Sequence, residues 1–397
     1  MTDHAVLRLR KDEDRRIRAG HLWVYSNEID VAATPLATLE AGTLVDLQDS
    51  RGNFLGRGYA NPRSLIAVRL LTRNANWPVD ASLFRTRIVA ALTLREKLFE
   101  GAPYYRLIHG EGDGLPGLVV DRFGEYLVVQ PNTAGIDRLL DQIIEVLVET
   151  VFPTGILIRA DSSARIPEGL ESYVRVAYGT VPDSVPLVEN GVRFEAPVST
   201  GQKTGWFYDH RLNRERLRRY VPGARVLDVF SYIGGWGVQA AAAGAREVLC
   251  VDSSAPALEA VAHNAALNGV ESIVNCERGD AFEVLTSLRG RGERFDVVVL
   301  DPPPFIKRKK DAREGEQAYQ RINRLAMELV IPGGILVTSS CSFHMGRDTL
   351  LLAALRASTG LGREAQLLEE GHQGPDHPIH LAIPETSYLK AFFLRVG

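Results

Sequence analysis

The feature that most constrains the fold is the alternation of short apolar runs and amphipathic stretches that starts near residue 200. Five runs have strand character: RVLDVF, EVLCVD, IVNCERGD, FDVVVLD and GGILVTSS. Helical stretches such as PALEAVAHNAALNG and QAYQRINRLAMELV lie between them. Strands that alternate with helices form a parallel sheet covered on both faces. The sequence therefore predicts a Rossmann-like α/β domain over residues 200–397.

Two further regions precede this domain. Residues 1–73 contain the alternating runs AVLRLR, GTLVDLQD, FLGRGYA and LIAVRLL, with a stretch of helical spacing, RKDEDRRIRAGHLWVY, between the first two. This pattern predicts a small β-barrel. Residues 74–190 combine the helical runs ASLFRTRIVAALTLREKLF and IDRLLDQIIEVLVETVF with strands, which indicates an α+β middle domain. Asn190-Gly191 predicts a hairpin that links this domain to about residue 200.

Composition and charge narrow the function classes. The 397 residues suffice for two or three domains, and 45% of them are apolar, as in globular proteins. The net charge of −3 excludes a uniformly basic coat but allows local basic faces. The three cysteines form no CxxC pair, and the charged N-terminal stretch has no apolar run. We therefore expect a cytoplasmic protein with no metal and no membrane partner, and the sequence indicates no particular oligomeric state.

A glycine-rich turn after the first strand indicates a ligand site. RVLDVF runs into SYIGGWGVQAAAAGA, where glycines let the backbone approach a ligand. The turn matches neither GxGxxG nor a P-loop. Asp252 ends the second strand, and Asp280 follows the third. Acids at the carboxyl ends of neighbouring parallel strands suit the ribose and the adenine amino group of a nucleoside cofactor.

Several of these motifs resemble those of a known enzyme class. VLDVFSYIGGWG, VDSS, GDAF and DPPPF resemble the successive motifs of class I S-adenosylmethionine-dependent methyltransferases. QKTGWFYDHR, HGEGDGLPGLVVDRFG and GPDHPIHLAIPETSYLKAF resemble the bacterial large-subunit 23S rRNA cytosine-5 methyltransferase family, and the N-terminal region resembles a PUA RNA-binding domain. The resemblance covers essentially the whole chain. It implies S-adenosyl-L-methionine as the cofactor and 23S rRNA, or a large-subunit precursor, as the partner.

The resemblance also implies a set of cofactor contacts. Asp252 would bind the ribose, Asp280 would lie near the adenine, and Asp301 would lie beside the transferable methyl group. Lys203 and Arg211 would contact the carboxylate of the cofactor or an RNA phosphate. The residues expected to line the methionine and ribose parts are Phe230, Gly234 and Gly235.

The chemistry of cytosine-5 methylation requires a nucleophile, for which Cys341 is the candidate. The carbon C5 of cytosine attacks a methyl group only after a thiolate has added at C6. Cys341 follows the fifth strand among serines, and the matching TxxCS cysteine is the nucleophile of the family that it resembles. Cys250 and Cys276 are expected to be small buried residues.

One departure from related enzymes concerns the release step. Many RNA cytosine-5 methyltransferases carry a second cysteine in the fourth-strand motif. Pro303 and Pro304 occupy that region here. Removal of the C5 proton must therefore use another base, either Asp301 or a water molecule.

Two alternative functions stay open. DPPPF also resembles the (D/N)PP(Y/F) motif of enzymes that methylate exocyclic amines, including those of guanine. In that chemistry Asp301 and Pro302 would accept hydrogen bonds from the target amine, and Phe305 would stack on the base. The other alternative is a catalytically silent RNA-binding assembly factor.

Clusters of basic residues are candidates for RNA contacts. The first cluster follows the proposed catalytic loop and consists of Lys307, Arg308, Lys309 and Lys310, with Arg313 nearby. Its position favours RNA binding over a merely solvated surface. A second run comprises Arg211, Arg214, Arg216, Arg218 and Arg219, for which a solvated helix face is an equal alternative.

Overall fold

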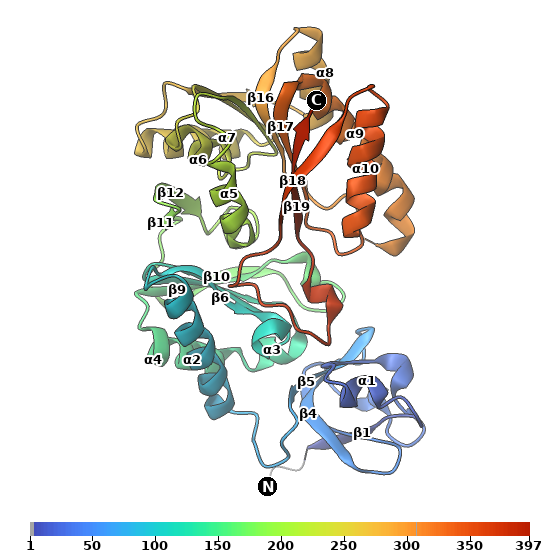
Figure 1. Cartoon of the computed structure of the whole chain (residues 1–397). Helices are drawn as coiled ribbons and strands as arrows, with labels where there is room; N and C mark the ends of the chain where they lie inside the picture. The colour runs from blue at the N-terminus through green and yellow to red at the C-terminus, as the bar shows by residue number, and fades with distance from the viewer. Residues whose placement is uncertain (1–3, 307) are drawn as a thin grey trace. The chain divides into compact units, whose positions relative to one another are not determined.

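The computed structural model describes residues 4–306 and 308–397, whose contacts divide into two compact units (Figure 1). The first unit holds the residues up to Val185 together with two later segments, Ala196–Tyr208 and Pro375–Thr386. The second unit consists of Pro186–Glu195, Asp209–Gly374 and Ser387–Gly397. This grouping differs from the predicted division, because the first two predicted domains share one unit and two short segments of the third belong to the same unit.

The first unit opens with a five-stranded sheet. Its strand order is β1-β3-β4-β5-β2, and the short helix α1 (Arg15–Arg18) lies between β1 and β2 in the chain. The strands are β1 (Ala5–Arg8), β2 (Trp23–Tyr25), β3 (Thr43–Gln48), β4 (Phe54–Ala60) and β5 (Ile66–Thr72). The four predicted strands are all present. The predicted helical stretch is shorter than expected, because its last residues extend into β2 and pair with β5.

A second five-stranded sheet forms the middle region, with the order β10-β9-β8-β7-β6. Its strands are β6 (Tyr104–His109), β7 (Leu118–Phe123), β8 (Tyr126–Pro131), β9 (Gly155–Ala160) and β10 (Tyr173–Gly179). The helices are α2 (Ala81–Leu98), α3 (Ala134–Arg138) and α4 (Leu140–Val151). The predicted second helix is thus divided in two, because Leu139 leaves the helical conformation.

Buried polar contacts join the two sheets of the first unit. The carboxylate of Glu168 accepts hydrogen bonds from Asn61 (2.8 Å) and Arg69 (2.9 Å). The buried Tyr59 hydroxyl lies 2.9 Å from the Thr133 hydroxyl. A buried charge is stable only when it is paired in this way. These contacts explain why two regions with separate sequence patterns form one compact unit.

The predicted hairpin is confirmed. It consists of β11 (Ser184–Glu189) and β12 (Val192–Pro197), joined by two residues with positive φ, Asn190 (54°) and Gly191 (78°). A two-residue turn of this kind matches the twist of an antiparallel pair.

The second unit is built on a seven-stranded sheet with the order β15-β14-β13-β16-β17-β19-β18. The strands are β13 (Arg225–Val229), β14 (Glu247–Asp252), β15 (Val274–Arg278), β16 (Phe295–Leu300), β17 (Val330–Ser340), β18 (Ala365–Gly371) and β19 (Lys390–Val396). The first five strands in the order are parallel, and β19 is antiparallel to both of its neighbours.

Helices cover both faces of this sheet, as Figure 1 shows. One face carries α5 (Arg211–Leu217), α6 (Gly237–Ala242) and α7 (Ala255–Leu267). The other face carries α8 (Ala281–Gly290), α9 (Ala312–Leu329) and α10 (Arg347–Thr359). The predicted α/β fold class is confirmed.

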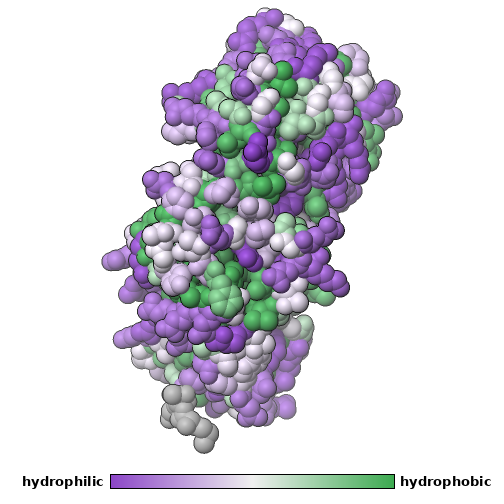
Figure 2. All heavy atoms as spheres, turned by 90° about the vertical axis from the view of Figure 1, so that its left-hand side faces the viewer, coloured by the Kyte–Doolittle hydropathy of each residue, from purple (hydrophilic) through white to green (hydrophobic). Residues whose placement is uncertain are grey.

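The molecular surface in Figure 2 is mostly hydrophilic, with smaller groups of apolar residues between the polar ones. Within residues 4–306 and 308–397, no helix has both the length and the apolar character needed to cross a bilayer.

Close packing between α6 and the sheet depends on Gly237. A Cβ atom at this position would lie 2.5 Å from Cys250 Sγ and 3.0 Å from Asp228 Oδ2. Both partners are fully buried and belong to the neighbouring strands β13 and β14. The side chains cannot move away, so only glycine fits.

We expect Gly237→Ala to lower the free energy of unfolding by about 1–3 kcal/mol, because the extra methyl group overpacks the core. The measurement is urea denaturation followed by circular dichroism. Gly290→Ala is the matched control, since a Cβ at Gly290 in α8 would meet no atom within 4 Å. Equal stability of the two variants would contradict the packing argument.

Candidate functional site

The carboxyl ends of the parallel strands bring three acids, two of them predicted site residues, to one edge of the sheet. Strands β13, β14 and β16 run in the same direction, so their carboxyl ends share an edge. Asp228 and Asp252 lie at the ends of β13 and β14, and Asp301 follows β16 directly. Both neighbouring carboxylates act to raise the pKa of Asp228, so the three groups interact electrostatically.

The turn after β13 has an unusual backbone. Phe230 (φ 66°) and Tyr232 (φ 48°) adopt the left-handed conformation, which non-glycine residues rarely do. Gly234 (φ 86°) also lies there, and a Cβ atom on it would lie 2.7 Å from Val238 Cγ2. Strained residues of this kind concentrate at ligand sites.

Gly235, the other predicted glycine, lies close to the side chain of Arg214. A Cβ atom on it would lie 3.1 Å from Nε of Arg214. Both predicted glycines thus occupy positions where a side chain would displace a neighbour.

Asp228 is a site residue that the sequence reasoning missed. Burial raises the pKa of its carboxyl to about 7, against the opposing effect of the Gly237 N–H, which donates to Oδ2 at 2.8 Å. Oδ1 is buried and receives no hydrogen bond from the described residues. A buried acceptor without a donor is rare in native proteins and suits a ligand that brings one. The signal in the sequence is an acid inside the apolar run RVLDVF.

Asp252 and Asp280 differ in their surroundings. Asp252 is half-buried and accepts the backbone N–H groups of Tyr232 and Ser254, each at 2.9 Å. Asp280 is exposed and accepts the Phe282 N–H at 2.9 Å as the N-cap of α8. A carboxylate accepts several hydrogen bonds, so both acids keep capacity for a ligand.

The Asp301 carboxylate is held from three sides. Trp236 donates Nε1–H to Oδ2 at 3.0 Å, and the Ser339 hydroxyl donates to Oδ1 at 2.8 Å. His210 Nε2 lies 3.1 Å from Oδ1. Burial alone would raise the pKa of Asp301, but the charge and hydrogen bond of His210, with those of Trp236 and Ser339, lower it to about 2. Asp301 is therefore ionised and a weak base at neutral pH.

Cys341 is half-buried and follows β17 directly, so it lies at the same edge. The residues around it are tied to the loop after Asp301. Ser342 Oγ donates to the Ile306 carbonyl at 2.6 Å, and Ser340 Oγ lies 2.7 Å from the Tyr319 hydroxyl. The candidate nucleophile and the DPPPF loop thus form one hydrogen-bonded structure.

Aromatic rings fill the space behind the two loops. The Phe305 ring lies 4.8 Å from that of Tyr319, 6.1 Å from Phe282 and 6.4 Å from Phe230. Pro302 is buried beside Asp301. Phe305 therefore contributes to packing.

The other two cysteines have different surroundings. Cys250 is buried, as predicted, and burial raises its pKa well above the usual value. Cys276 is exposed, so the prediction of a buried residue is wrong for it. The reason is that β15 is the edge strand of the sheet, which leaves most of its side chains accessible.

Arg211 and Lys203 are the two remaining predicted cofactor contacts. Arg211 is buried, and its Nε lies 3.6 Å from Glu189 Oε2. Lys203 is exposed and has a positive φ of 51°, with Nζ 4.6 Å from the centre of the Phe207 ring. It belongs to the first unit and so is not among the residues that the second unit assembles.

The basic residues after the DPPPF loop are accessible. Arg308, Lys309 and Lys310 are exposed, and Arg308 Nε lies 3.1 Å from Asp311. Lys307 lies outside the described residues. In the second basic run, Arg214 is buried, and its Nη1 lies 2.6 Å from Glu189 Oε1. Other members of the run also pair with carboxylates, namely Arg216, Arg218 and Arg219. These ion pairs favour a structural role for that run.

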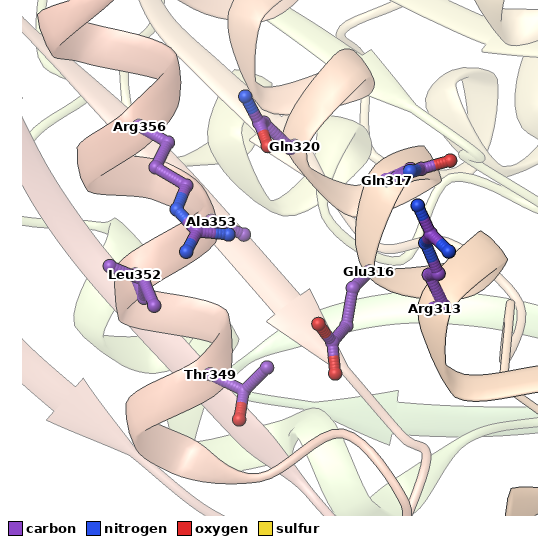
Figure 3. A pocket seen from close by; sticks show the side chains of 8 residues that line it. All are labelled: Arg313, Glu316, Gln317, Gln320, Thr349, Leu352, Ala353 and Arg356. Atoms are coloured by element: carbon purple, nitrogen blue, oxygen red, sulfur yellow. The ribbon is translucent and has the colours of Figure 1, made fainter.

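A groove on the outer helical layer adjoins this basic segment. It measures about 180 Å³ and lies between α9 and α10 (Figure 3). Its lining residues are Arg313, Glu316, Gln317, Gln320, Thr349, Leu352, Ala353 and Arg356. The groove is formed by helices and contains none of the strand-end acids.

The sheet order, the strained glycine-rich turn and the strand-end acids define a class I methyltransferase domain. A family model described as S-adenosylmethionine-dependent methyltransferase matches residues 171–392, and one described as a PUA-like domain matches residues 7–73. The predicted cofactor and the predicted domain types are therefore confirmed.

Several relatives that share one name are similar to this chain over its full length or nearly so. "Ribosomal RNA large subunit methyltransferase I" of Klebsiella pneumoniae (strain 342) is 38% identical over 403 residues, which cover 100% of both chains. The protein of that name from Shewanella denitrificans is 38% identical and covers 98% of this chain and 99% of its own. The chain belongs to the family of these large-subunit ribosomal RNA methyltransferases.

Solved structures share the fold. A SAM-dependent methyltransferase from Streptococcus mutans has a TM-score of 0.83 at 18% identity, over 98% of this chain and 100% of that one. A methyltransferase complexed with SAH has a TM-score of 0.85 at 18% identity, with the same coverage. At this identity the similarity concerns the arrangement of the elements.

The raised pKa of Asp228 predicts a pH dependence of stability. The folded protein keeps a proton that the unfolded chain releases above its usual pKa of 3.8. The free energy of unfolding therefore falls as the pH rises from about 4 to about 7. Urea denaturation across this range should show a smaller decrease for Asp228→Asn than for the wild type.

Asp348→Asn serves as the control, because the Asp348 side chain is 91% exposed. We expect it to retain the slope of the wild type. An unchanged slope in Asp228→Asn would show that Asp228 is ionised in the folded protein at these pH values.

Proposed function

We propose that this protein forms 5-methylcytosine in 23S rRNA, with Cys341 as the nucleophile and S-adenosyl-L-methionine as the methyl donor. Membership of the large-subunit ribosomal RNA methyltransferase family supports the substrate. The observation that carries the chemistry is the position of Cys341. It is half-buried at the edge where the strand-end acids lie, in a loop bonded to the DPPPF segment.

The residues of the glycine-rich turn fit the cofactor. The free Oδ1 of Asp228 would accept a hydrogen bond from it, and Asp252 would bind its ribose. Asp280 would lie near the adenine while it caps α8. The residues that would line the methionine and ribose parts are Phe230, Gly234 and Gly235. When bound, S-adenosyl-L-methionine supplies a methyl group that is activated by its bond to sulfur.

Cys341 acts by addition and elimination. Its thiolate would form a bond to C6 of the cytosine, and the electron pair of the C5–C6 double bond would then form the bond from C5 to the methyl group. The bond between that methyl group and sulfur would break, which leaves S-adenosylhomocysteine. A base then removes the C5 proton. The electrons of the C5–H bond restore the double bond, and the C6–S bond breaks to release the thiolate. Each turnover thus converts one cytosine to 5-methylcytosine and releases one proton.

Asp301 serves best as an orienting group. Its two oxygens already contact Trp236, Ser339 and His210, and its pKa of about 2 makes it a poor base. We therefore assign removal of the C5 proton to a water molecule in preference to Asp301.

The cysteine mechanism predicts a covalent adduct with RNA that contains 5-fluorocytidine. Fluorine at C5 is not lost as a proton, so the C6–S bond persists after methyl transfer. On a denaturing gel, wild type incubated with S-adenosyl-L-methionine and a 5-fluorocytidine 23S rRNA fragment should give a shifted band. We expect no such band for Cys341→Ala and an unchanged band for the control Cys276→Ala.

Methyl transfer to unmodified RNA by Cys341→Ala would contradict the mechanism and favour amine methylation. An absence of methyl transfer by the wild type on naked rRNA and on precursor particles alike would favour a silent assembly factor.

RNA contacts of the exposed basic segment are expected to depend on salt. Lys309 and Lys310 directly follow the DPPPF region, and each phosphate contact contributes about 0.7–0.9 to the slope of log K against log salt. Lys309→Gln/Lys310→Gln should therefore weaken binding of 23S rRNA fragments and lower this slope by up to about 2. Filter binding at several KCl concentrations measures both quantities.

The control is Arg246→Gln/Arg294→Gln, which removes the same charge from exposed residues at the amino ends of β14 and β16. We expect it to leave the slope almost unchanged. Equal effects of the two double variants would show that net charge, and not the segment after the DPPPF loop, determines binding.

A further inference from the structure

Lys390 lies next to the proposed nucleophile. It is the first residue of β19 and pairs with Ser340 in the antiparallel register of β17 and β19. Its Nζ donates a hydrogen bond to the carbonyl oxygen of Ser342 at 2.6 Å. The ammonium group of Lys390 is thus hydrogen-bonded to Ser342, the residue after Cys341. The backbone of Lys390 pairs with Ser340, the residue before Cys341.

The position is unusual for a lysine. The strand KAFFLRV is otherwise mostly apolar, and Lys390 is half-buried, whereas lysine side chains are normally exposed. Burial lowers the pKa of Lys390 to about 8, and the interaction with Cys341 opposes this effect. The two groups therefore lie close enough to influence each other electrostatically.

Other charged and titratable groups surround the same loop. The ionised Asp301 carboxylate binds Ser339, and a second negative charge close to it is disfavoured. His210 Nε2 lies 3.1 Å from Oδ1 of Asp301. The Tyr319 hydroxyl bonds Ser340, and burial raises its pKa above the usual range, so it stays neutral. A cation close to Cys341 would stabilise a thiolate there, and the ammonium group of Lys390 is such a cation.

We propose that Lys390 is a positioning residue that holds the Cys341 loop and stabilises the thiolate form of Cys341. Its role in methyl transfer rests on the proposed cysteine chemistry. Cations next to a cysteine favour the thiolate, which is the form that attacks. Sequence position alone gives no indication of this pairing, because Lys390 lies 49 positions after Cys341 along the chain.

The test is the pH dependence of Cys341 alkylation by iodoacetamide in the full chain without RNA. Cys276 is exposed and would also react, so all variants carry Cys276→Ser, whereas Cys250 is buried. Mass spectrometry of the peptide that contains Cys341 gives the rate at each pH. We expect the midpoint of the profile to lie below about 8.5, the usual value for a free cysteine.

Variants separate the charge of Lys390 from its hydrogen bond. Lys390→Gln keeps a donor for the Ser342 carbonyl but removes the charge, and should raise the midpoint by about one pH unit or more. Lys390→Arg keeps the charge and should restore a midpoint near that of the wild type. A purely structural role predicts that Lys390→Gln leaves the midpoint unchanged while it alters only thermal stability.

Either of two results overturns the proposal. One is an unchanged midpoint in a folded Lys390→Gln protein. The other is a wild-type midpoint at or above about 8.5, a measurement that needs no Lys390 variant. This assay is independent of methyl transfer. A midpoint that rises in Lys390→Gln, without an adduct of the wild type to 5-fluorocytidine RNA, would support the Lys390–Cys341 pairing and contradict the proposed function. An adduct to this RNA, with an unchanged midpoint in Lys390→Gln, would support the proposed function and contradict the pairing.

Discussion

The hydrogen bonds of the Asp301 carboxylate are the interactions on which the candidate site depends. They join the end of β16 to three other segments through His210, Trp236 and Ser339. Removal of one hydrogen-bond donor to an ionised carboxylate costs about 1.5–3 kcal/mol. The same contacts align the DPPPF loop with the glycine-rich turn and with β17, which ends just before Cys341. The geometry of the candidate site and the local stability of this edge therefore depend on the same atoms.

Most of the fold follows from the sequence because each strand and helix carries its own periodicity. The five parallel strands and the Asn190-Gly191 hairpin are local signals, and the structure confirms them. The failures have tertiary causes. Residues Trp23–Tyr25 continue a helical spacing but pair with β5. Cys276 has the apolar character of a core residue but lies on the edge strand β15. The local pattern of apolar residues determines neither which strands pair nor the order of the strands in the sheet.

The site is predictable only in part for a similar reason. Asp252, Asp301 and Cys341 follow strands, and the common direction of these strands brings them to one edge. Their supporting residues come from elsewhere in the chain. His210 precedes α5, and Lys390 begins a strand added antiparallel to the others. The clues in the sequence were polar residues within apolar runs, such as Asp228 in RVLDVF and Lys390 in KAFFLRV.

The most direct test of cytosine-5 methylation is to follow the hydrogen that the reaction must release. Incubation of the protein with S-adenosyl-L-methionine and 23S rRNA that carries tritium at C5 of cytidine measures this release. Our account predicts one tritium released into water for each methyl group transferred, and no release by Cys341→Ala. Methyl transfer without tritium release would contradict it, because methylation of a nitrogen leaves the C5 hydrogen in place.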